Sequence, residues 1–163
     1  MWSRLPTPRI MANPAMIWFQ TDTSLNNASE VYENDLGEFE TRLFLFQQLN
    51  DQNEAVRGAT GWDGDRYAVV NTPQGQGIVW LTVWDSQVEA GEFYHLADQA
   101  VQARYSTKPA GGSNDLVKKY SAAGRTVQVS TLEIKGRPVV IYADVPAGAN
   151  PNIINPAQVT LKQ

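Results

Sequence analysis

The chain lacks cysteine altogether and contains a single histidine, His95, among its 163 residues. The absence of cysteine excludes thiol catalysis, disulfide bonds and zinc–thiolate sites. A lone histidine on the expected polar face of a helix has no second ligand for a metal and offers no base for a serine triad. We therefore predict that the chain is not an enzyme and that it holds neither a metal nor a cofactor.

Long apolar runs and an excess of positive charge are also missing. No segment approaches the ~18 consecutive apolar residues that a membrane span needs, and the prolines near the start interrupt the apolar core that a signal peptide would require. The formal net charge is −4, so nucleic acid is not an expected partner. A composition of 42% apolar and 18% charged residues is typical of a globular domain.

Residues 61–105 carry the strongest structural pattern. Residues 78–84, with the sequence IVWLTVW, are apolar on both faces, which predicts a central strand covered on both sides. A preceding strand over residues 62–72 reaches it through a glycine-rich hairpin loop. Ser86 and Glu89 then have the spacing of a capping box. Apolar residues recur three and four apart from residue 93 to residue 101, so an amphipathic helix is predicted after the central strand.

An earlier helix is predicted to begin at Asp35, to run to about residues 53–57 and to end at Gly58. Asp35 and Glu38 have capping-box spacing, as at the other helix. The apolar face is broad, so we expect burial against a sheet or between layers. Its stripe consists of Leu36, Phe39, Leu43 and Phe46, widened by Phe44, Leu45 and Leu49.

The residue pattern in the second half of the chain predicts mostly strands. Residues 125–145 form the clearest hairpin, with a two-residue turn at Lys135-Gly136. A long polar loop over residues 106–124 precedes it, and residues 158–161 are expected to add a short edge strand. The fold class is therefore α+β: an antiparallel sheet of four or more strands, covered by two helices and preceded by an extended N-terminal arm.

We divide the chain into an extended arm and linker over residues 1–34 and a single α+β domain over residues 35–163. Three prolines in the first fourteen residues forbid a continuous helix there. The arm either packs on its own domain or docks on a partner, and we favour docking. The partner-binding side chains would be the apolar ones of the arm: Trp2, Leu5, Ile10, Met11, Met16, Ile17, Trp18 and Phe19. Phe44 and Leu45 are a second contact surface if the chain itself does not cover them.

Two further groups of residues invite a functional interpretation. Asp63, Asp65 and Asp85 flank a glycine turn and could hold Ca²⁺, but the regular spacing of a calcium loop is absent. We favour structural roles for them, with Asp65 paired to Arg66 or Arg42. An aromatic face of the sheet is the alternative site, where a small ligand would bind against Trp62, Tyr67, Trp84 and Tyr142.

Four segments, in this order, carry a family resemblance: DLGEFE (35–40), GWDGDRY (61–67), WLTVWDS (80–86) and GRPVV (136–140). Over roughly residues 30–160 the chain resembles the C-terminal domain of uncharacterised bacterial and archaeal secreted or lipoprotein-like proteins. Those proteins look like neutral metallopeptidases, often inactive ones, with a zinc-binding helix upstream. This chain lacks that helix, so the resemblance implies a domain kept for binding or assembly outside the cytoplasm, in the periplasm.

Together these observations predict a noncatalytic accessory subunit. It would dock through its N-terminal arm onto the protein subunits of a larger assembly, without a transmembrane segment of its own; peripheral association with a membrane is compatible with this. The alternative is an extracytoplasmic domain that binds a small ligand on the aromatic face of its sheet. An enzyme ranks third because the residue types of a reactive centre are missing.

Overall fold

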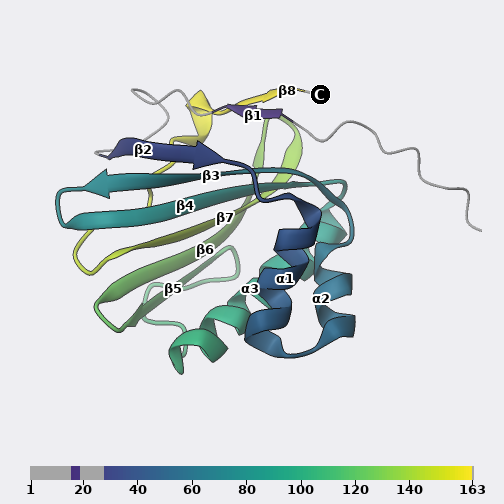
Figure 1. Cartoon of the computed structure of the whole chain (residues 1–163), viewed down its shortest axis with the longest axis horizontal. Helices are drawn as coiled ribbons and strands as arrows, with labels where there is room; N and C mark the ends of the chain where they lie inside the picture. Colours follow the sequence, from purple (N-terminus) through teal and green to yellow (C-terminus); the bar gives the residue numbers. More distant parts are fainter. Residues whose placement is uncertain (1–15, 19–27, 163) are drawn as a thin grey trace, which may run out of the picture.

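The computed structural model describes residues 16–18 and 28–162 of the chain, with side chains described from residue 28 to residue 161. Its main feature is a six-stranded antiparallel sheet in the order β2-β3-β4-β7-β6-β5 (Figure 1). These strands are β2 (Ser29–Asn34), β3 (Trp62–Thr72), β4 (Gly75–Trp84), β5 (Val117–Ala122), β6 (Arg125–Ile134) and β7 (Arg137–Pro146). A separate two-stranded sheet pairs β1 (Met16–Trp18) with β8 (Thr160–Lys162).

Three α-helices are present among the described residues: α1 (Gly37–Leu49), α2 (Gln52–Ala59) and α3 (Gln87–Tyr105). They gather on one side of the sheet, away from the β1–β8 pair (Figure 1). A short 3₁₀ turn, η1 (Pro156–Gln158), precedes β8. The predicted α+β class with an antiparallel sheet is confirmed, but with one more helix than the two we expected.

Both faces of the sheet are buried, each in its own hydrophobic cluster. On the helical face, Trp80 and Trp84 of β4 pack with the apolar side chains of α1 and α3. On the opposite face, Val79, Leu81 and Val83 of the same strand are fully buried. The segment that follows β7 covers this opposite face with Ala149, Ile153, Ile154, Val159 and Leu161. The expectation that residues 78–84 form a central strand covered on both sides is therefore confirmed.

The helix and the two hairpins predicted most directly from the sequence are also confirmed. The Ser86 hydroxyl accepts a hydrogen bond from the Glu89 backbone N–H (3.2 Å) and begins α3. Strands β3 and β4 form one hairpin, in which Tyr67 lies opposite Trp80. Strands β6 and β7 form the other, and its turn residues Lys135 and Gly136 both have positive φ, as a type I′ turn requires.

The single helix predicted from Asp35 to residues 53–57 is wrong, because the chain breaks at Asn50. Asn50 adopts a left-handed conformation with φ 52°, which asparagine tolerates better than most residues. The side chain of Asp51 then accepts a hydrogen bond from the Glu54 backbone N–H (3.0 Å) and starts α2. The pair Asn50-Asp51 is thus a stop signal followed at once by a start signal, and α1 and α2 become two separate helices.

The predicted cap of the first helix is also wrong. Leu36, not Asp35, is the N-cap residue of α1, and its side chain makes no capping hydrogen bond. The carboxylate of Asp65 on β3 accepts hydrogen bonds from the backbone N–H groups of Leu36 and Gly37, both at 2.8 Å. It also accepts one from the Trp80 indole (2.9 Å). Asp65 is therefore a cap supplied by the sheet, and the expected pairing with Arg66 or Arg42 is not its main role.

The domain boundary that we expected at residue 35 falls between β2 and α1, within the folded unit. Residues 29–34, which we assigned to a linker, form β2 and pair with β3 along one edge. In the arm, Met16, Ile17 and Trp18 pair through their backbone with β8, so this part folds onto its own chain rather than extending away from it. The other predicted docking residues, Trp2, Leu5, Ile10, Met11 and Phe19, lie outside the described residues.

Candidate functional site

Helix α1 carries apolar side chains on two opposite sides, and only one side is covered. On the inner side Leu45 is fully buried, and Phe44 makes edge-to-face contacts with Trp80 and Tyr142 at centroid distances of 5.5 and 5.7 Å. Phe44 and Leu45 are therefore not a contact surface. On the outer side the side chains of Phe39 and Phe46 are 62% and 40% exposed. The stripe that we expected to be buried thus faces outward.

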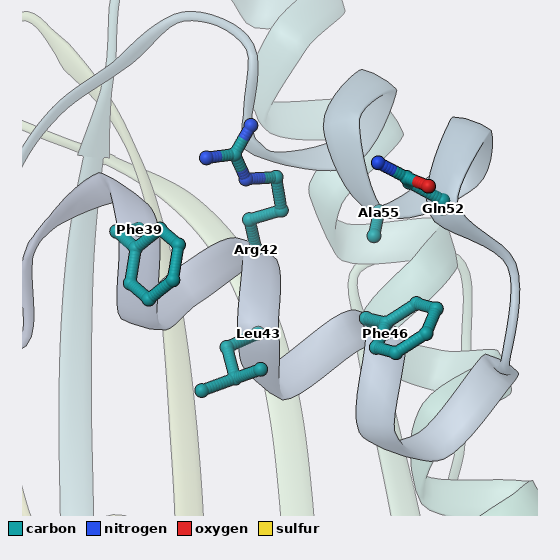
Figure 2. A pocket seen from close by; sticks show the side chains of 6 residues that line it. All are labelled: Phe39, Arg42, Leu43, Phe46, Gln52 and Ala55. Atoms are coloured by element: carbon teal, nitrogen blue, oxygen red, sulfur yellow. The ribbon is translucent and has the colours of Figure 1, made fainter.

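A groove of about 360 Å³ lies between α1 and α2 beside this outer stripe. Figure 2 shows Phe39, Leu43 and Phe46 following one another along α1, with α2 alongside. The groove is lined by Phe39, Arg42, Leu43 and Phe46 from α1 and by Gln52 and Ala55 from α2. This arrangement exists because the break at Asn50 lets α2 fold back beside α1, which a single continuous helix would not allow.

Arg42 supplies the charge in the groove. Its guanidinium lies 5.5 Å from the centroid of the Phe39 ring, a cation–π geometry. No ion pair joins Arg42 to any carboxylate within the part of the chain that the structure describes. The groove therefore combines apolar walls with one positive charge that no acid among the described residues neutralises.

A second cleft, of about 450 Å³, lies on the helical face of the sheet at the C-terminal end of α3. It is lined by Val69, Gln76, Gly77, Ile78, Arg104, Tyr105, Arg125 and Asp144. Asp144, which is buried, accepts hydrogen bonds from the Tyr105 hydroxyl (2.5 Å) and from Arg125 Nε (2.7 Å). The Arg125 guanidinium also donates to the Gln76 carbonyl at 3.3 Å. Arg125 is thus held in place by the sheet.

The tyrosines near this cleft respond to the same charges. Burial raises the pKa of Tyr105 above its ordinary value, and the hydrogen bond to Asp144 acts in the same direction. Burial likewise raises the pKa of Tyr142, with a further contribution from Asp144. The positive charges of Arg104 and Arg125 act in the opposite direction and lower the pKa of both hydroxyls. Both tyrosines stay neutral hydrogen-bonding groups near pH 7.

The aromatic ligand face predicted from the sequence is only partly present. Trp84 is fully buried and stacks on Phe93 with a centroid distance of 4.7 Å, so it does not line a ligand site. Trp62 packs against the helical-side core at the other end of β3. Tyr67 and Tyr142 do lie in one row across the sheet, opposite Trp80 from either side.

Of the three aspartates considered for Ca²⁺, two use their carboxylates in separate structural contacts, and the third makes a backbone hydrogen bond. Asp63 forms an ion pair with Arg137, Asp65 caps α1, and the Asp85 backbone N–H donates to the Gly61 carbonyl (2.9 Å). Among the described residues, no three acidic or histidine side chains gather as a metal site would need. His95 is exposed and hydrogen-bonds Gln99 at 3.0 Å, on the polar side of α3 where we expected it.

Residues 24–151 match a family model described as a domain of unknown function, DUF8575. The match includes strands β2 to β7 and all three α-helices, and so most of the chain. The chain belongs to the DUF8575 family. No curated protein and no solved structure matches it. The resemblance to metallopeptidase-like proteins therefore stays a prediction, and the roles of the groove and the cleft in this DUF8575 member rest on their physical chemistry.

Sequence reasoning missed both hollows for identifiable reasons. The outer stripe of α1 is visible as a period of three and four residues, but the breadth of the apolar face predicts burial of the whole face and does not show which side stays uncovered. The groove beside it depends on α2, a separate helix that the prediction of one continuous helix leaves out. Arg104, Arg125 and Asp144 come from three elements whose contact depends on the strand order, and no local pattern joins them.

No helix in the described part of the chain is both long and apolar enough to cross a membrane.

Proposed function

We propose that this DUF8575 domain is a noncatalytic interaction domain that binds an amphipathic helix of a partner protein in the groove between α1 and α2. The observation that carries the proposal is the outer stripe of α1, where Phe39, Leu43 and Phe46 occupy successive turns beside a groove. A helix that is apolar on both sides is normally covered on both sides. The chain covers the inner side itself, and a partner would cover the outer side.

The energetic argument concerns the two phenylalanines. Complete burial of one such side chain contributes roughly 1.5–3 kcal/mol. Because 62% of Phe39 and 40% of Phe46 remain to be buried, the pair would supply about 1.5–3 kcal/mol on contact, which reaches the scale of an interface hot spot. Single exposed apolar residues are common on protein surfaces, but two aromatic rings along one groove form a contiguous patch.

The chemistry of the groove specifies the partner. Grooves between helices accept amphipathic helices whose anchors recur at three- and four-residue spacing. Arg42 has no acidic partner within the described residues, and it lies between apolar side chains. A partner helix with apolar anchors and one carboxylate facing Arg42 would complement the groove in both shape and charge.

The proposed role agrees with an accessory subunit of a larger assembly, which was the prediction from the sequence. It moves the principal contact from the N-terminal arm to α1 and α2. The location outside the cytoplasm rests on the family resemblance and is proposed on that basis alone. A contribution from residues 1–15 remains part of the proposal and can be measured separately.

The test begins with the tagged full chain, crosslinked in the cells that make it, followed by identification and purification of the captured protein. Binding of that protein is then measured by calorimetry for F39S, R42Q and the control V88S. Val88 is 72% exposed on α3 and lies outside the groove. We expect F39S to weaken binding about 5- to 30-fold, because about 1–2 kcal/mol of burial is lost. V88S should bind like the wild type.

The charge is tested by a double-mutant cycle between R42Q and removal of the facing carboxylate in the partner. The two changes should be non-additive if the groups are in contact. Equal binding by wild type and F39S would contradict the proposal, as would equal weakening by F39S and V88S. Self-association of the purified chain that F39S abolishes would make a second copy the occupant. Deletion of residues 1–15, which leaves β1 intact, measures the contribution of the arm.

A further inference from the structure

The cleft at the C-terminal end of α3 has a charge opposite to that of the chain as a whole. The chain carries a formal net charge of −4. Two guanidinium groups, of Arg104 and Arg125, and one carboxylate, of Asp144, line the cleft, so one positive charge is in excess. A local reversal of sign beside a cleft concentrates anions there.

The two arginines differ in their availability. Arg125 is already engaged, because it binds both the Asp144 carboxylate and the Gln76 carbonyl. Arg104 is exposed, lies 5.4 Å from the centroid of the Tyr105 ring, and forms no ion pair with a carboxylate among the described residues. One guanidinium is therefore free to receive a ligand and the other is a fixed part of the wall.

Apart from the polar Gln76 and from Gly77, the remaining lining is apolar or aromatic. Val69 and Ile78 lie opposite each other on β3 and β4 and form apolar lining on the helical face, with the Tyr105 ring beside them. The side chain of Tyr142 lies on the same face of the sheet, two residues before Asp144 on β7. A volume of about 450 Å³ is within the range of small-molecule sites, roughly 300–1,000 Å³.

We propose that this cleft binds a small organic monoanion, a carboxylate carried on an apolar body, with the carboxylate on Arg104 and the body against Val69 and Ile78. A planar guanidinium matches a carboxylate with two parallel hydrogen bonds. A phosphate dianion fits less well, because its second charge would find Arg125 already neutralised by Asp144. The proposal is independent of the partner groove between α1 and α2, since the two sites share no residue.

A simpler role for Arg104 is to compensate the negative end of the α3 dipole, because it lies in the last turn. Arg57 provides a control for this role, although it pairs with Glu54 (2.6 Å) where Arg104 has no such partner among the described residues. It is exposed, it is the basic residue in the last turn of α2, and it lies outside the cleft. The variants R104Q and R57Q therefore remove the same charge from the same kind of helix position, and only R104Q changes the cleft.

The test is a titration of the full chain followed by amide NMR shifts. The probes are benzoate, cyclohexanecarboxylate and octanoate, with benzamide as the neutral analogue and phenyl phosphate as the dianion. We expect at least one carboxylate to give saturable shifts at residues 76–78 and at Tyr105. Benzamide and phenyl phosphate should each bind with an affinity at least about tenfold lower than that of the carboxylate. R104Q should lose about tenfold in carboxylate affinity while R57Q retains it.

Several results would overturn the assignment. They are the absence of saturation with all three carboxylates, equal binding of benzoate and benzamide, tighter binding of phenyl phosphate, and unchanged affinity in R104Q. Shifts confined to α1 and α2 would place the anion on Arg42 instead, and this too would refute the site. The amide spectrum of R104Q without ligand shows whether the variant is folded, so loss of binding is distinguishable from loss of structure.

Discussion

Replacing Asp65 by alanine tests the most consequential contact in the fold. Asp65 is 4% exposed, and its two carboxylate oxygens accept three hydrogen bonds from Leu36, Gly37 and Trp80. The substitution D65A leaves the first N–H groups of α1 and the Trp80 indole without this acceptor. It therefore loosens the attachment of α1 to the sheet at the helix end where the groove begins.

The expected magnitude follows from two opposing effects. Hydrogen bonds to a charged group contribute about 1.5–3 kcal/mol each, so three of them would give at most about 9 kcal/mol. Burial of the carboxylate opposes this gain, and water reaches part of the exposed helix end in the variant. We expect a net loss of about 2–4 kcal/mol, which for a chain of this size lowers Tm by about 5–15 °C.

Urea unfolding followed by tryptophan fluorescence measures the loss, and D35A is the control. Asp35 is the residue that the sequence alone nominates as the cap, yet it is exposed and makes no capping hydrogen bond to α1. D35A should stay within about 0.5 kcal/mol of the wild type, as most surface substitutions do. If D65A is as stable as the wild type, or if D35A is the more damaging change, the reasoning about the sheet-supplied cap is refuted.

The remaining predictions concern pH, the helix break and helix packing. Burial raises the pKa of Asp65 above its ordinary value, so the carboxyl group binds a proton more readily in the folded state than in the unfolded state. The stability of the wild type relative to D65A should therefore increase as the pH falls from neutral through the folded-state pKa. A decrease of this stability difference in paired urea titrations would contradict the sign. At Asn50, N50V should destabilise by about 1–2 kcal/mol in thermal unfolding because φ is 52°, whereas N50G should be nearly neutral. G58A should cost about 1–3 kcal/mol, because a new Cβ would lie 2.5 Å from Leu45 Cδ1 and 2.6 Å from Leu96 Cδ1. G91A, at an exposed position of α3 with nothing within 4 Å of the new Cβ, should instead stabilise by about 0.5–1 kcal/mol, and equal effects of the two alanines would show that packing is not the cause.

Local patterns predicted the elements whose causes are local. Ser86 and Glu89 begin α3 because their capping contact spans only three residues. Strand β4 was predictable because its alternate side chains are buried in two different hydrophobic clusters, one on each face of the sheet. The break at Asn50 also has a local cause, because a left-handed asparagine is followed directly by an N-cap aspartate. It could have been predicted from those two residues. Strand β2 was harder to see, because its exposed edge position gives it no apolar period.

Through its local patterns the sequence determined the α+β class, two hairpins and the helix after β4, and its composition determined the absence of cysteine and the single histidine. Only the tertiary structure decided that Asp65 caps α1, that the stripe of Phe39 and Phe46 faces outward, and that Arg104 and Asp144 line one cleft. The physical reason is the sequence separation over which each interaction acts. Hydrogen-bonded turns and amphipathic periods act within a few residues, whereas a cap 28 residues away from Gly37 and a cleft shared by strands and a helix exist only once the sheet order has brought them together.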